Sequence, residues 1–254
     1  MLWSPEAMQA SNFLWRQTGD EMLSRLACFT VKPKVILDVG CGLGDMSAAL
    51  AKLYPEASII SLDLELALLQ AGDAASPVQA NAAALPLKTG SVDLVVAHGL
   101  LPWVETWTPV IEEWRRVLAP AGVLMLSALG PDTLRECEAV NAIYPVRVDM
   151  HDLGDILIKA GFLEPVLDAA HFTIRYQALS RLEADLSGMG LPQFTCKPSD
   201  TGLQVTFEVI WAHTFAPALS NTVSVSDDGL ARFPLRLLRR SERDAEYPKV
   251  TAGE

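Results

Sequence analysis

Short apolar runs alternate with amphipathic stretches along the first half of this chain. The apolar runs are rich in Val, Ile and Leu, and they have the length of buried strands. Between them, apolar residues mostly recur at the spacing of a helix with one buried face. This alternation predicts an α/β fold with a parallel sheet and crossover helices. We expect strands over 35–39, 58–63, 77–81, 91–97 and 123–128, and helices over 45–53, 64–70 and 108–118.

The second half of the chain completes the predicted sheet. Two further strands are expected, over 172–176 and 203–215, and the regular alternation of the second one indicates an antiparallel strand. The fold class is therefore a Rossmann-like α/β sheet of seven strands, six parallel and the last antiparallel, with helices on both faces.

Segments outside the sheet are expected to cover it and to close it. After the fifth strand, a segment over about 130–150 with a helix at 132–142 is expected to form a lid over the carboxyl ends of the strands, where open α/β sheets bind ligands. We expect a single domain over 1–254 that begins with a helical segment at about 5–30, including a helix over 5–26. Further helices are expected over 151–160 and 179–189, and a disordered tail at about 242–254.

The first expected strand runs directly into a glycine-rich turn, Gly40-Cys41-Gly42-Leu43-Gly44. Glycines allow a tight turn and a close approach of the backbone to a ligand. The spacing is G-x-G-x-G, whereas dinucleotide-binding turns have G-x-G-x-x-G with the pyrophosphate on the helix N-terminus. Asp38 lies two residues before the first glycine, and its carboxylate would repel a pyrophosphate and attract a cation. S-Adenosylmethionine (SAM) fits this turn, because it carries a sulfonium and an ammonium group and no phosphate.

A second acid, Asp63, ends the second expected strand. A carboxylate at this position can accept hydrogen bonds from both hydroxyls of a ribose. The alternative is that the glycine turn simply follows an α/β strand and that Asp63 caps a helix. The turn and the acid agree in position, and this agreement favours a site for SAM.

Composition narrows the class of partner. The chain has a formal net charge of −11 and a pI of about 4.8, which argues against a nucleic-acid substrate because phosphate contacts need a basic face. Basic residues gather near the end of the chain, at 232–243, and could dock an acidic partner, although a solvated tail is the favoured explanation. No apolar run approaches the ~18 residues of a membrane span. Because the start of the chain also lacks a charged-then-apolar leader pattern, we expect a cytoplasmic location.

The cysteines, Cys28, Cys41, Cys137 and Cys196, are scattered and form no C-x-x-C pair. Their spacing indicates neither a disulfide framework nor a zinc site, and we expect no metal. Cys41 lies within the glycine turn and is expected to serve there as a small side chain.

Several segments in the second half of the chain are distinctive: Leu129–Glu136, Asp149–Asp155, Ala160–Phe162 and Thr206–Phe215. Together they resemble the malonyl-acyl carrier protein O-methyltransferase family of biotin synthesis, one of the class I SAM-dependent methyltransferases. The resemblance covers roughly residues 12 to 217. It extends to relatives that keep these segments and act elsewhere, such as a complex I assembly factor proposed to hydroxylate arginine.

The resemblance implies roles for two residues that follow strands. The class places a polar side chain after the third strand, against the adenine amino group. Asn81 stands there beside the backbone N–H of Ala82, although Asn81 could equally cap a helix. His98 follows the fourth strand, where the class sets groups against the methionine part or the acceptor, and a polar loop residue is the alternative. The expected cofactor-binding residues are Asp38, Gly40, Cys41, Gly42, Asp63, Leu64, Asn81, Ala82 and His98.

The resemblance also implies a reaction, the transfer of a methyl group from SAM to the free carboxylate of a malonyl group on acyl carrier protein, with S-adenosylhomocysteine as product. A carboxylate is already ionised near pH 7 and needs no strong general base. An arginine matches it with two parallel hydrogen bonds. We therefore expect Arg135, Arg147 and His98 as catalytic residues, with Arg175 as a further candidate. The alternatives are a SAM-dependent enzyme of the same fold with another small-molecule or protein acceptor, and a non-catalytic SAM-binding assembly factor.

Overall fold

The computed structural model describes residues 4–139, 147–191, 194–196, 202–218, 224–225 and 231–232. The chain divides into two compact units, Met1–Ala218 and Leu219–Glu254. In the second unit the structure describes one antiparallel pair of short strands, β10 (Ser224–Val225) and β11 (Ala231–Arg232). The predicted tail at 242–254 lies outside the described residues.

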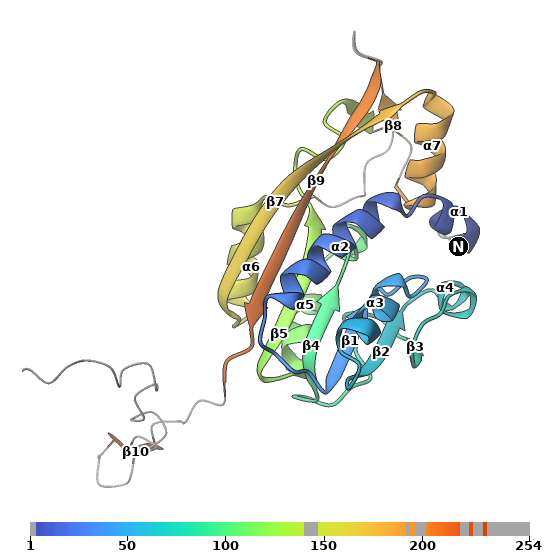
Figure 1. Cartoon of the computed structure of the whole chain (residues 1–254). Helices are drawn as coiled ribbons and strands as arrows, with labels where there is room; N and C mark the ends of the chain where they lie inside the picture. The colour runs from blue at the N-terminus through green and yellow to red at the C-terminus, as the bar shows by residue number, and fades with distance from the viewer. Residues whose placement is uncertain are drawn as a thin grey trace, which may run out of the picture. The chain divides into compact units, whose positions relative to one another are not determined.

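The first unit is built on a seven-stranded sheet in the order β3-β2-β1-β4-β5-β9-β7 (Figure 1). Neighbouring strands are parallel from β3 to β5, whereas β9 is antiparallel to both β5 and β7. One strand therefore opposes the other six, which confirms the predicted fold class. The strands are β1 (Val35–Val39), β2 (Ser58–Asp63), β3 (Pro77–Gln79), β4 (Val92–Ala97), β5 (Leu118–Leu129), β7 (Leu163–Tyr176) and β9 (Leu203–Phe215).

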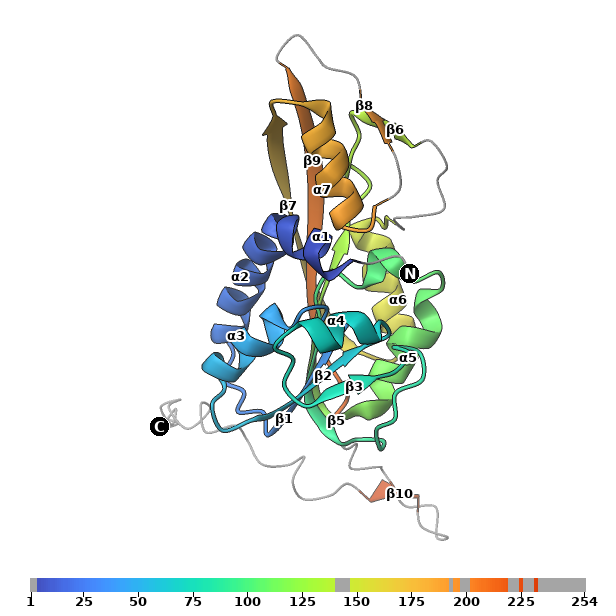
Figure 2. The ribbon, with the colours of Figure 1, turned by 90° about the vertical axis from the view of Figure 1, so that its right-hand side faces the viewer.

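Helices cover both faces of this sheet (Figures 1 and 2). They are α1 (Pro5–Ala10), α2 (Phe13–Ala27), α3 (Asp45–Leu53), α4 (Leu66–Ala71), the 3₁₀ helix η1 (Leu101–Trp103), α5 (Trp107–Val117), α6 (Met150–Lys159) and α7 (Leu179–Gly188). Among the described residues, none of these helices combines the length and the hydrophobicity needed to cross a membrane.

Successive residues of the central strands enter two separate cores, one on each face. Ile36 of β1 packs with buried residues of α2 and α3, and its neighbour Leu37 packs with buried residues of α5 and α6. Side chains alternate between the faces of a strand, so a strand covered on both faces needs an unbroken apolar run. This is why the short runs of Val, Ile and Leu predict the central strands well.

A third core lies at one end of the long β7–β9 pair. Here α7 packs with Phe207 of β9 and Leu14 of α2. The chain before α2 turns to reach α7, where the Ser11 hydroxyl donates a hydrogen bond to the buried Asp185 carboxylate at 3.2 Å. The single helix predicted over 5–26 is therefore wrong, because this contact divides it into α1 and α2.

The segment after β5 runs beside β9 and is not a helix where the structure describes it. The Leu134 N–H donates to the Thr206 carbonyl at 2.6 Å, and the Glu136 carboxylate accepts from the Thr206 N–H at 2.9 Å. Leu134 has a φ of +56°, which a right-handed helix excludes. The helix predicted over 132–142 is therefore wrong up to residue 139, because hydrogen bonds to β9 replace the helical hydrogen bonds. Residues 140–146 lie outside the described part.

A disulfide joins Cys137 and Cys196, which lie 59 residues apart in the chain. The two cysteines face each other across a short antiparallel pair, β6 (Cys137–Ala139) and β8 (Phe194–Cys196). The expectation that these cysteines form no disulfide is wrong for this pair. The sequence spacing carries no signal of it, because tertiary packing brings the two strands together. Cys28 and Cys41 are free.

Gly72 lies directly after α4 and packs closely against Leu43 of the glycine turn. A Cβ at this position would meet the Leu43 carbonyl group, so Gly72→Ala must displace backbone. We expect the free energy of unfolding to fall by about 1–3 kcal/mol, as overpacking usually costs, measured by urea denaturation. Gly154→Ala in α6 is the control, because its Cβ would meet only Leu167 Cδ1 at 3.5 Å. An unchanged midpoint for Gly72→Ala would contradict the packing described here.

Candidate active site

The carboxyl ends of β1, β2 and β4 open into a cavity of about 1560 Å³. Loops after these strands form its floor, and one face of α2, the start of α3 and the end of α7 contribute to its walls. Ligands of open α/β sheets bind at this edge. All of the expected cofactor-binding residues line the cavity, namely Asp38, Gly40, Cys41, Gly42, Asp63, Leu64, Asn81, Ala82 and His98.

The glycine turn is held against the end of β2. The N–H groups of Gly40 and Cys41 both donate to the Leu62 carbonyl, at 2.7 and 3.0 Å. Gly42 has a φ of +55°, and a Cβ there would lie 2.8 Å from the Met8 Cε atom of α1. A side chain at position 42 is therefore disfavoured by the backbone conformation, and it would also have to displace the end of the Met8 side chain.

Asp63 bridges the turn and the segment before α4. Its Oδ2 atom accepts the Gly42 N–H at 2.9 Å, and its Oδ1 atom accepts the Glu65 N–H at 2.9 Å. The carboxylate thus stabilises the turn at the N-terminal side of α4 and lines the cavity as well. Each carboxylate oxygen has a second lone pair, so the same group can still accept two ribose hydroxyls.

Asp38 is buried at the base of the turn. Burial raises the pKa of its carboxyl to about 7, and repulsion from the Asp63 carboxylate adds to this increase. The Ser47 hydroxyl, which donates a hydrogen bond to Asp38 at 2.6 Å, lowers the pKa and so limits the increase. A nearby cation lowers the pKa of such a buried carboxyl and so favours its ionised form. A ligand with positive charge therefore completes this site electrostatically.

Asn81 uses its side-chain oxygen for a local turn. Its Oδ1 atom accepts the Ala83 N–H at 2.8 Å and closes this turn. No helix follows Asn81, so the alternative role as a helix cap is wrong. The amide nitrogen remains a donor and Oδ1 keeps a second lone pair, so Asn81 can still donate to a ring nitrogen of adenine or accept from its amino group.

His98 is fully hydrogen-bonded within the protein. Its Nε2 atom lies 2.8 Å from the Trp15 carbonyl, and its Nδ1 atom lies 2.8 Å from the Ser127 hydroxyl, which accepts the Gly99 N–H. We assign the Nε2–H tautomer, because a carbonyl can only accept. Burial lowers the pKa of His98 to about 4, so the ring is neutral near pH 7. His98 therefore ties α2 to β4 and β5, and this geometry gives no support to its predicted catalytic role.

The predicted acceptor arginines lie away from the cavity. The Arg135 guanidinium pairs with Asp132 at 3.2 Å and with Glu136 at 3.5 Å. Arg147 donates to the Thr133 carbonyl at 2.8 Å. Neither residue lines the cavity, and Arg175 does not line it either. The described part of the predicted lid, 130–139 and 147–150, likewise contributes no residue to the lining.

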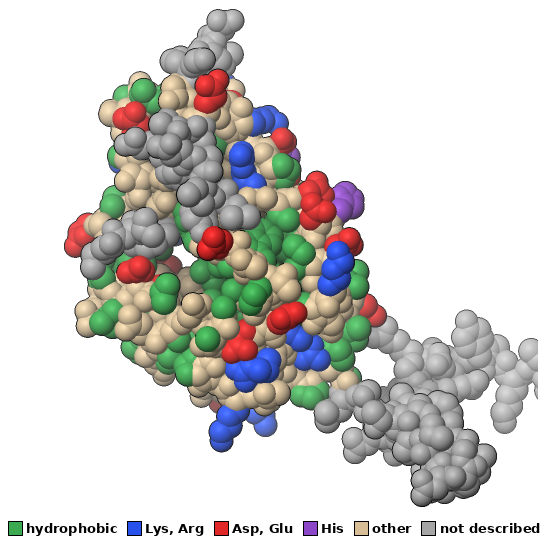
Figure 3. Space-filling model, turned by 180° about the vertical axis from the view of Figure 1, so that it is seen from behind, with side chains coloured by type: hydrophobic (Ala, Val, Ile, Leu, Met, Phe, Trp, Pro, Cys, Tyr) green, Lys and Arg blue, Asp and Glu red, His purple; other side chains and the backbone are tan. Residues whose placement is uncertain are grey.

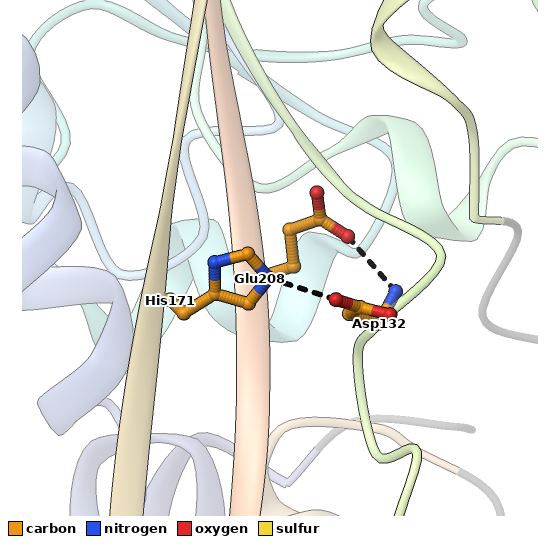
Figure 4. A group of neighbouring side chains, drawn as sticks. All are labelled: Asp132, His171 and Glu208. Carbon is orange, nitrogen blue, oxygen red and sulfur yellow. Dashed lines mark hydrogen bonds and ion pairs between the residues drawn. The ribbon is translucent and has the colours of Figure 1, made fainter.

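Asp132, His171 and Glu208 come together beside this segment, with ligand-type atoms within 4.8 Å of one another (Figure 4). The Asp132 Oδ2 atom lies 3.0 Å from His171 Nε2 and also pairs with Arg135. The Glu208 Oε2 atom accepts the Asp132 N–H at 2.8 Å. The group joins the segment after β5 to β7 and β9, and Arg135 supplies positive charge next to Asp132.

Several lining residues escaped the sequence interpretation. Met8 of α1, Trp15 and Arg16 of α2 and Leu191 after α7 all line the cavity. A helical face made of Asn12, Arg16 and Gly19 is visible in the sequence, although nothing local shows that it faces the turn. The contribution of Leu191 follows only from the packing of α7 against α1.

Comparison with known proteins identifies the family. A family model described as a methyltransferase domain matches residues 37–126. A malonyl-acyl carrier protein O-methyltransferase from Methylovorus sp. (strain MP688) is 35% identical over 248 residues, covering 82% of this chain and 84% of that protein. The chain belongs to the malonyl-acyl carrier protein O-methyltransferase family.

Solved structures agree with this family at the level of fold. The YcgJ protein from Bacillus subtilis has a TM-score of 0.60 at 12% identity, covering 78% of this chain and 99% of that one. Haemonchus contortus phosphoethanolamine N-methyltransferase 2, solved in complex with SAM, has a TM-score of 0.57 at 12% identity, covering 84% of this chain and 57% of that one. Identities this low show a shared fold alone.

The chain is thus a SAM-dependent methyltransferase, and the residues of the cavity fit this cofactor. Asp63 offers acceptors for hydroxyls, and the buried Asp38 favours a positively charged ligand. The glycine turn leaves its backbone open to a close approach. These groups suit a nucleoside with a cationic side chain better than they suit a phosphate.

We expect Asp63→Ala to weaken SAM binding by about tenfold or more, because it removes the acceptors at the cavity and charge-assisted hydrogen bonds typically contribute about 1.5–3 kcal/mol. Isothermal titration calorimetry measures this. Asp73→Ala removes an exposed carboxylate nearby and is the matched control. Equal dissociation constants for the two variants, with both proteins folded, would contradict the assignment of Asp63.

SAM binding should also depend on pH through Asp38. In the ligand-free protein this carboxyl is mostly protonated at pH 6 and mostly ionised at pH 8, and the cationic ligand favours the ionised form. SAM affinity is therefore expected to rise by up to about tenfold between these pH values. Ser47→Ala removes a donor to the carboxylate and should shift the rise to higher pH. A flat profile in wild-type protein would contradict this account.

Proposed function

We propose that this chain transfers the methyl group of SAM to the free carboxylate of a malonyl group on acyl carrier protein, in the synthesis of a biotin precursor. The observation that carries the proposal is the 35% identity, over most of both chains, to a protein named for that reaction. The arrangement of the cavity supports it independently, because the cavity suits an acceptor that needs no general base.

His98 is the only histidine among the described residues that line the cavity, and it is neutral with both ring nitrogens engaged. Burial also raises the pKa of the Cys41 thiol, which disfavours a thiolate nucleophile. Methyl transfer to an amine or hydroxyl usually requires removal of a proton. A malonyl carboxylate is already ionised near neutral pH, so positioning and exclusion of water are sufficient for its methylation.

In this proposal Asp38, Asp63 and the glycine turn hold SAM, and Asn81 with Ala82 contacts its adenine. The bound cofactor supplies an electrophilic methyl group on a sulfonium. Trp15, Trp103 and other apolar residues of the lining keep water from the reacting atoms.

The carrier partner would dock beside the end of the β7–β9 pair. Arg175 is exposed at the end of β7, Arg181 is 59% exposed at the start of α7, and Arg135 is 55% exposed beside β9. The face in Figure 3 shows acidic and basic side chains scattered around a hydrophobic centre. Because the chain has a net charge of −11, exposed arginines such as these would have to supply the attraction for an acidic carrier, although Arg135 and Arg181 also pair with Asp132 and Asp185. A cytoplasmic location remains part of the proposal.

Mass spectrometry of malonyl-loaded acyl carrier protein, incubated with this protein and SAM, tests the proposed reaction. We expect the mass of one methyl group on the carrier-bound acyl group. Acetyl-loaded carrier, which lacks the free carboxylate, should gain nothing, and free malonate shows whether the carrier is needed. No methylation of the malonyl-loaded carrier, with SAM binding demonstrated separately, would contradict the proposal and favour another acceptor or a non-catalytic role.

A further inference from the structure

Acidic side chains dominate the cavity. Among the described residues, two cations line it, Arg16 and Lys52, against the acids Asp20, Asp38, Asp45, Asp63, Glu65 and Glu105. SAM carries a carboxylate in addition to its two cationic groups, and a malonyl acceptor would carry another. A carboxylate placed among these acids is repelled unless a cation lies beside it. The cavity therefore needs a cation at the point where a ligand carboxylate enters.

Arg16 lies on the face of α2 that covers the glycine turn. One turn before it, Asn12 Nδ2 donates to the Asp45 carboxylate at the start of α3, at 3.0 Å. One turn after it, Gly19 is so close to the end of β4 that a Cβ would lie 3.4 Å from His98 Nε2. Residues three and four apart share a helix face. Position 16 is therefore located between the N-terminus of α3 and the carboxyl end of β4.

Lys52 is in a different part of the cavity. It belongs to the last turn of α3, seven residues after Asp45, so it lies about 10 Å further along the helix from the glycine turn. This distance leaves Arg16 as the cation of the lining that is next to the turn.

The Arg16 side chain is exposed, and its guanidinium makes no hydrogen bond or ion pair with the residues that the structure describes. The arginine nine residues later in the same helix differs, because Arg25 pairs with Asp168 at 2.7 Å. Arg116 likewise pairs with Glu113 at 2.7 Å. Arg16 thus offers a complete guanidinium fork to a ligand in the cavity, a geometry that matches a carboxylate.

We propose that Arg16 binds a carboxylate inside this cavity, from the methionine part of SAM or from the acceptor. The first source requires only the cofactor, whereas the second rests on the proposed function. If the acceptor supplies the carboxylate, Arg16 takes the role predicted for Arg135 and Arg147, because those two residues donate to protein groups outside the cavity.

Two nucleosides distinguish the sources. S-Adenosylhomocysteine carries the amino acid carboxylate, and 5′-methylthioadenosine keeps the nucleoside and sulfur without it. If SAM supplies the carboxylate, Arg16→Gln weakens S-adenosylhomocysteine binding by about ten- to a hundredfold and leaves methylthioadenosine binding unchanged. If the acceptor supplies it, affinity for both nucleosides is unchanged and the KM for malonyl-loaded carrier rises by a similar factor.

Matched variants make the result specific. Arg16→Lys keeps the charge without the fork and should recover part of the loss, and Lys52→Gln removes the other cation and should change neither nucleoside affinity. Equal losses for both nucleosides in Arg16→Gln would overturn the proposal. The proposal would also be overturned if Arg16→Gln left the affinity for S-adenosylhomocysteine unchanged and the KM for malonyl-loaded carrier was unchanged too. The same holds if that affinity is unchanged and the carrier is not methylated at all. Wild-type binding of S-adenosylhomocysteine without methylation of the carrier would contradict the proposed function alone, because the comparison of nucleosides would still test Arg16.

Discussion

The hydrogen bond from the Gly42 N–H to the Asp63 carboxylate is the interaction on which the site depends. It connects the turn after β1 to the end of β2, so the two strands present the backbone and the carboxylate to one point of the cavity. Gly42 makes this bond with a φ of +55°, a left-handed conformation that favours glycine. A change at either partner would disturb the turn as well as the ligand contact.

Electrostatics around that turn explain why this cavity suits SAM. Burial leaves the Asp38 carboxyl with a pKa of about 7, so a positively charged ligand is favoured there. Burial also keeps His98 neutral, and its hydrogen bonds tie α2 to the sheet. Arg16 of α2 adds positive charge to the lining next to the glycine turn. The same protein groups therefore separate the places where a ligand cation and a ligand carboxylate are stabilised.

The central strands and the glycine turn could be predicted because local patterns determine them. Apolar runs such as Val35–Leu37 are buried on both faces, and the G-x-G-x-G spacing requires glycine backbone conformations. The segment around Leu134 could not be predicted, since its bonds go to β9, which is about seventy residues distant in the chain. The Cys137–Cys196 disulfide and the place of Arg16 in the cavity likewise depend on packing between distant segments. The periodicity of apolar residues gives no information about such packing.

The most direct test of the account is a crystal structure of this protein with S-adenosylhomocysteine. The account predicts that the ribose hydroxyls lie within hydrogen-bond distance of the Asp63 carboxylate, with the adenine beside Asn81 and the sulfur directed toward the turn at Gly40. A nucleoside bound elsewhere, or one in which the ribose makes no contact with Asp63, would contradict the central claim that the bridge between β1 and β2 forms the cofactor site.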